Sequence, residues 1–324
     1  MANDPTAPSR LDHPRNKRDS MLGGPKPKNP LKDSHLDREQ AKKIVETPQT
    51  LSPAYRLAFD DPDFLCRPET RPIRLQLELL KPEMMLEDAG IVSTTVLFGG
   101  ARIAEPGTDP WAAKNETQRK NLKESSKYYT EARRFAQLAS EASKKTDFTE
   151  YVVVTGGGPG VMEAGSRGAL DVGAPNIGLN IVLPHEQAPN PYVTPEFAFN
   201  FHYFAIRKMH FLMRAASVAV FPGGFGTLDE FFETLTLIQT GRMARIPVLL
   251  FGKRFWDRAI DIDALAEEGT ISPDDPDLFT VVDTAEEGWQ VVSDFYGLDG
   301  SAPARAEAEP QPTVVEGRRE TAAE

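Results

Sequence analysis

A nine-residue run in the second half of the chain, PGGFGTLDE at positions 222–230, combines three glycines with two acids. Because Gly223, Gly224 and Gly226 have no Cβ, their N–H groups can approach an anion closely. A helix is expected from about 227 to 240, and the unpaired N–H groups at a helix N-terminus favour negative charge. The run therefore predicts a loop that holds a phosphate group and opens a helix.

Two residues of this run, Thr227 and Glu230, allow two interpretations. As the N-cap, Thr227 could also donate its hydroxyl to a phosphate oxygen. The Thr-x-x-Glu spacing equally fits a capping box, in which the Glu230 side chain bonds back to the Thr227 N–H. A capping box does not need the neighbouring glycines, so their presence favours a ligand site into which Glu230 carries a carboxyl group.

A second glycine-rich run, GGGPG at positions 156–160, follows an expected strand at 151–155. It does not fit the dinucleotide-binding pattern G-x-G-x-x-G, because Val161 occupies the last glycine position, and it lacks the lysine and serine of a P-loop. Two interpretations stay open. The glycines either permit a tight turn from strand to helix, or form a second ligand loop in which Gly157 and Gly158 contact the substrate.

The expected helix at 205–216 carries two cations near its start, Arg207 and Lys208. Cations at a helix N-terminus oppose the helix dipole, so a bound anion would compensate them. The alternative is an ordinary solvated face. The same helix has an apolar stripe formed by Ile206, Met209 and Met213.

Composition excludes several classes of function. The 324 residues carry 37 Lys and Arg against 48 Asp and Glu, a formal charge of −11, which argues against binding nucleic acid. The single cysteine, Cys66, excludes an internal disulfide, and the five histidines show no metal-ligand spacing, so no metal is expected. No apolar run approaches the roughly 20 residues of a membrane span. Residues 1–43 resemble neither a signal nor a transit peptide, so a cytoplasmic protein is expected.

These residues are positioned by strands that alternate with helices. The strands are solidly apolar, as in sheets that are buried on both faces. The pattern predicts an α/β, Rossmann-like open parallel sheet with helices on both faces, in which ligands bind beyond the carboxyl ends of the strands. The expected strands are 92–98, 151–155, 177–183, 197–201, 218–221, 246–251 and 279–282; the expected helices are 116–144, 161–173, 205–216, 227–240, 256–268 and 285–295.

Four regions follow from this pattern. Residues 91–297 are expected to form the Rossmann-like domain that carries the candidate ligand site. Residues 1–50 and 298–324 are rich in charged residues, proline and alanine and are expected to be disordered or loosely ordered. Residues 51–90 are expected to form a helical N-terminal extension that packs on the main domain.

The run at 222–230 resembles the P-G-G-x-G-T-x-x-E signature of the Lonely Guy (LOG) family, whose members are cytokinin riboside 5′-monophosphate phosphoribohydrolases and related nucleotide nucleosidases, including AMP nucleosidases. The segment 156–164 and the pair Arg207-Lys208 are similar to further elements of that family. The resemblance covers about residues 91–297, and the extension resembles the longer bacterial members. One departure is Gly100, where relatives usually have serine.

The resemblance implies hydrolysis of the N-glycosidic bond of a nucleoside 5′-monophosphate, AMP or an N6-modified AMP, to free base and ribose 5-phosphate. Glu230 would be the carboxylate beside C1′, because bond cleavage builds positive charge on the ribose. Arg207 matches the catalytic arginine. The residues that would bind substrate are Gly223, Gly224, Gly226, Thr227, Lys208, Gly157, Gly158 and Glu233, the last with ribose hydroxyls unless it lies on a solvated face.

The resemblance also implies a homodimer or higher oligomer, with the site at the dimer interface and no cofactor. Such proteins carry an older label, lysine decarboxylase, but the sequence offers no context for a pyridoxal-phosphate lysine. Two alternatives come from other classes: a non-catalytic carrier or sensor of a phosphorylated ligand, and an NAD-linked enzyme, which the missing G-x-G-x-x-G disfavours. The preferred base, and a role in cytokinin signalling or in nucleotide salvage, stay open.

Overall fold

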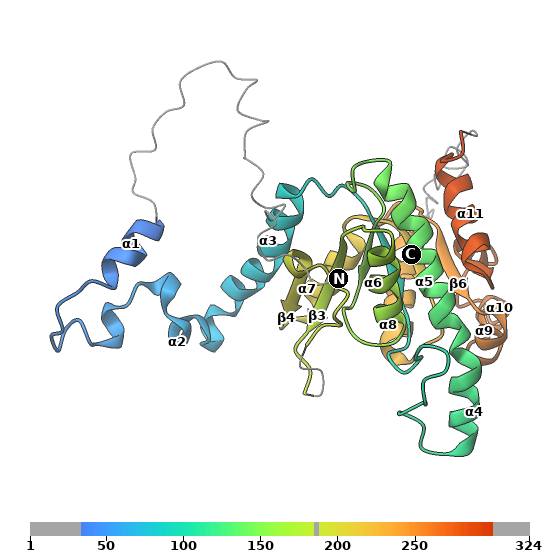
Figure 1. Ribbon diagram of the computed structural model, residues 1–324, viewed down its shortest axis with the longest axis horizontal. Coiled ribbons are helices and arrows are strands. Elements are labelled where there is room, and N and C mark those ends of the chain that lie inside the picture. The colour runs from blue at the N-terminus through green and yellow to red at the C-terminus, as the bar shows by residue number, and fades with distance from the viewer. Residues whose placement is uncertain (1–33, 185–187, 301–324) are drawn as a thin grey trace, which may run out of the picture. The chain divides into compact units, whose positions relative to one another are not determined.

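The computed structural model describes residues 34–184 and 188–300, and the chain divides into two compact units, Met1–Asp88 and Ala89–Glu324 (Figure 1). The described part of the first unit is helical, with α1 (Ser34–Ala41), α2 (Pro62–Leu65) and α3 (Arg71–Asp88). Helix α2 begins where the Asp61 carboxylate accepts the N–H groups of Asp63 and Phe64. Helix α3 lies where a helical extension is expected, whereas its packing on the main domain stays a prediction.

The segment 1–50, expected to lack regular structure, contains helix α1 in its described part. Residues 1–33 of this segment lie outside the described residues. The same holds for residues 301–324, which make up nearly all of the expected tail at 298–324.

The second unit is built on a parallel sheet. Seven strands are described, in the order β4-β3-β2-β1-β5-β6-β7, and each neighbouring pair is parallel. This confirms the predicted α/β, Rossmann-like class. The strands are β1 (Thr94–Phe98), β2 (Val152–Thr155), β3 (Asn176–Ile181), β4 (Ala198–Phe201), β5 (Ala215–Val220), β6 (Val248–Phe251) and β7 (Thr280–Val282).

Helices cover both faces of the sheet. Leu97 of β1 belongs to one buried cluster with Phe135 of α5 (Lys127–Lys144). Its neighbour Phe98 instead meets Phe211 of α7 (Phe204–Leu212), with ring centroids 4.9 Å apart. Successive strand residues point to opposite faces, so α5 and α7 cover opposite sides. Helix α6 (Val161–Asp171) packs beside α5 (Figure 1).

Three of the expected helices differ most from the observed ones. The expected helix 116–144 is divided at Ser126 into α4 (Glu116–Ser125) and α5. The expected helix 256–268 is likewise two helices, α9 (Lys253–Ala259) and α10 (Ile262–Glu267), because the Asp261 side chain caps α10. Helix α7 ends at Leu212 and not at 216, because the apolar run from Ala215 enters the sheet as β5. The remaining helices are α8 (Phe225–Gln239) and α11 (Ala285–Tyr296).

The strand order reverses between β1 and β5, which leaves a crevice at their carboxyl ends. The loops after the two strands are joined by a hydrogen bond of 2.9 Å from the Gly100 N–H to the Pro222 carbonyl. The fold therefore brings the expected phosphate loop to the position where open α/β sheets bind ligands. Within the described ranges, no helix is both long and apolar enough to span a membrane.

Candidate active site

A cavity of about 260 Å³ lies at this crevice. Its walls come from the ends of β1, β2 and β5 and from helices α6, α7 and α8. The lining residues are Phe98, Gly99, Gly100, Ala101, Gly156, Met162, Phe204, Arg207, Phe211, Gly224, Gly226, Thr227, Asp229 and Glu230. The sequence-predicted residues Glu230, Arg207, Gly224, Gly226 and Thr227 therefore meet in one cavity.

Helix α8 begins two residues earlier than the sequence suggests. Gly224 is its N-cap, without a side-chain hydrogen bond, and Thr227 lies inside the first turn. The capping-box interpretation of Thr227 and Glu230 is therefore wrong. Thr227 packs instead into the space that Gly223 leaves: a Cβ at position 223 would lie 2.1 Å from the Thr227 hydroxyl oxygen.

The helix start is open to the cavity. Apart from the neighbouring residues and the backbone of the helix itself, a Cβ added at Gly224 or Gly226 would meet no atom within 4 Å, so there is free space beside both residues. The first three or four N–H groups of an α-helix have no partner within the helix. The N-terminus of α8 thus presents unpaired donors and the positive end of a 15-residue helix to a cavity of small-molecule size.

Glu230 lies deeper in the same cavity, on α8. Its side chain is only 6% exposed, and its Oε2 has no hydrogen-bond partner among the described residues. Burial raises the pKa of Glu230 to about 7, although the positive charges of Lys208 and Arg207 act in the opposite direction. A buried carboxyl group that titrates near neutral pH and has an oxygen without a partner can accept or release a proton.

Arg207 reaches the cavity from α7. Its Nε donates to the Leu179 carbonyl at 2.7 Å, and its guanidinium group lies 5.0 Å from the Phe211 ring. A Cβ at Gly156 would lie 2.6 Å from an Arg207 nitrogen, so the glycine makes room for the guanidinium group. The sequence prediction did not include Gly156 as a site residue; its place at the end of a strand, at the start of the GGGPG run, was the available signal.

Other predicted residues lie outside the set that lines the cavity: Gly223, Gly157, Gly158, Lys208 and Glu233. The N–H of Gly157 donates to the Thr155 hydroxyl at 3.1 Å. The carbonyls of Gly157 and Gly158 accept the side-chain amide of Asn190 at 3.2 and 3.1 Å. In this structure the backbone groups of Gly157 and Gly158 serve the turn. No group of His, Cys, Asp and Glu suited to a metal ion occurs in the described part of the chain.

Residues 162–292 match the model of a family described as possible lysine decarboxylase, the older label of the family that the signature at 222–230 resembles. Over these residues the chain is similar to the LOG family. The matched region contains both Arg207 and Glu230, whereas the glycine loop after β1 lies outside it.

Solved structures resemble this chain at a low level. The protein TM1055 is 21% identical, over 62% of this chain and 98% of that chain, with a TM-score of 0.38. The molybdenum cofactor carrier protein of Chlamydomonas reinhardtii is 14% identical, over 63% of this chain and 99% of that chain, with a TM-score of 0.38. No curated protein matches the chain.

Gly100, where LOG relatives usually have serine, has little room for a side chain. A Cβ there would lie 3.0 Å from the Pro222 carbonyl oxygen and 3.4 Å from the Gly223 Cα. A serine at this position therefore requires the two loops to separate by a few tenths of an ångström. The departure from the family pattern goes together with a tight contact between the two loops.

Lys208 is held by two carboxylates of α8. Its Nζ lies 2.7 Å from Glu233 Oε2 and 3.0 Å from Asp229 Oδ1. Burial alone lowers the pKa of Lys208, but the hydrogen bonds to Glu233 and Asp229 outweigh it and the net pKa is raised. The charge at the start of α7 is therefore compensated by neighbouring acids, and neither a bound anion nor a solvated face is needed to explain Lys208. The ion pair with Lys208 also explains Glu233, which was expected to bind ribose hydroxyls or to lie on a solvated face.

Proposed function

We propose that this protein hydrolyses the N-glycosidic bond of a nucleoside 5′-monophosphate, with release of the free base and ribose 5-phosphate. The observation that carries the proposal is the Glu230 carboxyl group, buried and without a partner for Oε2, in the same cavity as a free helix N-terminus. A site that only held an anion would gain nothing from the Glu230 carboxyl group beside it, because an ionised carboxylate repels the anion.

The phosphate is assigned to the start of α8. There is free space where side chains would stand at Gly224 and Gly226, and Thr227 lines the cavity. Backbone donors and the helix dipole together favour a dianion at this position. The ribose then extends along α8 toward Glu230.

Glu230 and Arg207 are assigned to the chemical step. Cleavage of the glycosidic bond builds positive charge on the ribose, and an ionised Glu230 stabilises that charge and orients or deprotonates the attacking water. Arg207, whose Nε is already fixed on the Leu179 carbonyl, positions the substrate and favours the departing negative charge. A pKa of about 7 for Glu230 makes the carboxylate available near neutral pH.

The residues do not fit the decarboxylase description. Pyridoxal-phosphate chemistry depends on a lysine that forms a Schiff base, and such a lysine must lose its proton. None of the described residues that line the cavity is a lysine. The neighbouring Lys208 has a raised pKa and two carboxylate partners, the opposite of what this role requires.

A second copy of the chain is proposed to cover the mouth of the cavity, as the family resemblance implies. Phe225, the first residue of α8, is 92% exposed beside the proposed phosphate position, and Phe204 at the cavity wall is 54% exposed. Exposed aromatic side chains at a site entrance are typical of interfaces. The proposed setting is the cytoplasm, with AMP or an N6-modified AMP as substrate.

The test is a substrate panel. The full chain is incubated with AMP, with N6-prenyl AMP and with other nucleoside monophosphates, and chromatography measures free base and ribose 5-phosphate. We expect base release from at least one monophosphate and much less from the matching nucleoside, which lacks the phosphate. A folded protein that binds the monophosphates but releases no base from any of them would be a carrier, and the proposal would be wrong.

A further inference from the structure

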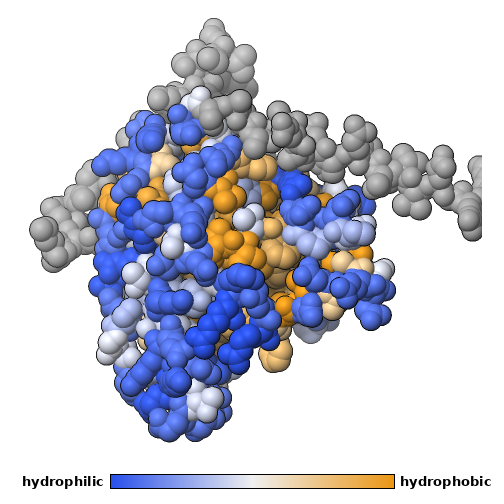
Figure 2. Space-filling view, turned by 90° about the vertical axis from the view of Figure 1, so that its right-hand side faces the viewer, coloured by the Kyte–Doolittle hydropathy of each residue, from blue (hydrophilic) through white to orange (hydrophobic). Residues whose placement is uncertain are grey.

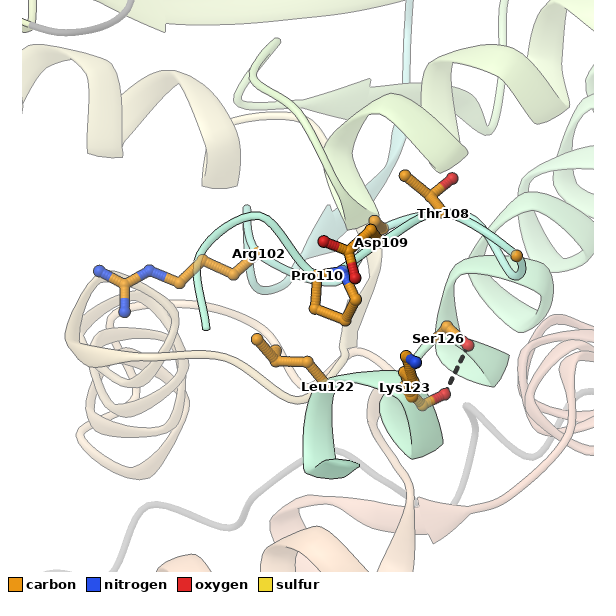
Figure 3. Close-up of a pocket in the computed structure, with 9 residues that line it drawn as sticks. Arg102, Thr108, Asp109, Pro110, Leu122, Lys123 and Ser126 are labelled. Atoms are coloured by element: carbon orange, nitrogen blue, oxygen red, sulfur yellow. Dashed lines mark hydrogen bonds between the residues drawn. The ribbon is translucent and has the colours of Figure 1, made fainter. Parts of the chain in front are cut away.

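A second hollow, of about 430 Å³, lies between the region where α4 meets α5 and helix α9. It shares no lining residue with the active-site cavity. It shares Arg102 and Leu122 with an adjoining hollow of about 400 Å³. Figure 3 shows that adjoining hollow, in which the loop with Thr108, Asp109 and Pro110 lies opposite Leu122, Lys123 and Ser126.

The 430 Å³ hollow gathers positive charge in a chain whose formal charge is −11. Four cations line it, Arg102, Lys127, Arg254 and Arg258, against one carboxylate, Glu124. Glu124 pairs with Arg254 at 2.5 Å. For the other three cations, no carboxylate of the described residues lies within ion-pair distance. A concave surface lined by one sign of charge concentrates ions of the opposite sign.

The floor of this hollow is apolar. Phe255, half-buried, and Leu122 contribute to it, and the buried ring of Tyr128 lies 4.9 Å from the Lys127 ammonium nitrogen. Figure 2 shows a mostly hydrophilic side of the molecule on which hydrophobic side chains gather near the middle. Aromatic floors surrounded by arginines favour flat ligands, because a ring can stack on both the aromatic and the guanidinium planes.

We infer that this hollow binds an aromatic polyanion, a small molecule with two or more negative charges and a flat ring system. The charged part lies against Arg102, Lys127 and Arg258, and the ring lies on Phe255 and Tyr128. The site is separate from the one proposed for the substrate, although Ala101 lines the active-site cavity and the next residue, Arg102, lines this one.

The experiment measures binding of three probes to the full chain by calorimetry. ATP has both features, inorganic tripolyphosphate has only the charge, and adenosine has only the ring. We expect ATP to bind at least about 10-fold more tightly than either of the others. Equal binding of ATP and tripolyphosphate, or of ATP and adenosine, would overturn the proposed ligand class.

Variants locate the ATP site. Arg258→Glu is expected to weaken ATP binding at least about 10-fold, and Phe255→Ala about 5-fold, because charge-assisted hydrogen bonds and ring stacking are lost. Arg242→Glu is the matched control, since Arg242 is also exposed but does not line this hollow. Circular dichroism checks that each variant is folded, and Lys127→Glu replaces any that is not. If ATP binds equally to the wild type, Arg258→Glu and Phe255→Ala, it binds elsewhere and the inference is wrong.

Discussion

The loops that open α6 and α8 look alike in sequence but differ in what their glycines do. Each follows a buried parallel strand, contains three or more glycines and leads into a helix without a side-chain cap. In the first loop, a Cβ at Gly157 would lie 2.1 Å from Asn180 Oδ1, and one at Gly160 would lie 2.5 Å from the Gly100 carbonyl oxygen. In the second, Gly224 and Gly226 face open space. Gly157 and Gly160 of the first loop therefore serve packing, whereas Gly224 and Gly226 of the second leave room for a ligand.

The acids that follow the two loops differ in the same way. Glu163 on α6 accepts a hydrogen bond of 2.9 Å from the Tyr129 hydroxyl. Glu230 on α8 is buried with an oxygen that has no partner among the described residues. A buried polar atom without a partner costs free energy, and such a cost is typical of sites that act on a ligand. The comparison teaches that a glycine run indicates a ligand loop under two conditions. The space beside its glycines must be empty, and the acid that follows on the helix must have no partner within the described protein.

The largest expected effect comes from exchanging these two acids for amides. Glu230→Gln removes the carboxylate that stabilises charge on the ribose, so we expect kcat for nucleoside monophosphate hydrolysis to fall at least about 100-fold. Glu163→Gln keeps its contact with Tyr129, so its kcat should stay within about 3-fold of the wild type. Base release measured by chromatography under saturating substrate checks both values. Equal losses in the two variants would remove the distinction between the two helices.

Much of this comparison could be predicted from the sequence, because apolar strands, glycines and a helix start are local patterns. The parallel sheet and the position of the loop at 222–226 follow from them. The start of α8 was predicted two residues late, because Thr227 is a good N-cap by type, whereas the chain uses Gly224. The partners of Lys208 come from another helix, and no local pattern contains them.

The two glycine runs could not be separated by sequence for a related reason. Whether a Cβ at Gly157 has room depends on Asn180, 23 positions further along the chain, which approaches only when β3 pairs with β2. Both runs have the composition of ligand loops. Only the folded chain distinguishes a glycine that another side chain crowds from a glycine that faces a cavity.

The next largest effect, on the free energy of unfolding, comes from replacing Gly157 and Gly224 with alanine. Gly157 has φ +71°, which L residues rarely adopt, and a methyl group there would collide with Asn180. We expect Gly157→Ala to lower the free energy of unfolding by about 3 kcal/mol, which is roughly 10 °C in Tm. Gly224→Ala should change it by no more than about 1 kcal/mol.

The same pair of variants separates stability from binding. The methyl group of Gly224→Ala enters the cavity at the proposed phosphate position, so KM for AMP should rise about 10-fold at nearly unchanged Tm. Thermal unfolding followed by circular dichroism, together with initial rates, measures the two properties. A stable Gly157→Ala, or a Gly224→Ala with unchanged KM, would contradict the assignment of packing to one loop and ligand to the other.

The last expected effect is a dependence of stability on pH that comes from Glu230. An unfolded glutamate titrates near 4.5 and the folded Glu230 near 7, so between these values the unfolded state loses its proton first. The free energy of unfolding therefore falls as pH rises through this window, by up to about 3 kcal/mol in total. Glutamine cannot ionise, so Glu230→Gln should be more stable than the wild type by up to that amount at pH 8 and by less at pH 5. Urea unfolding at both pH values measures the gap. A gap that is equal at pH 5 and pH 8, or of opposite sign, would mean that the Glu230 carboxyl group is not desolvated as the structure places it.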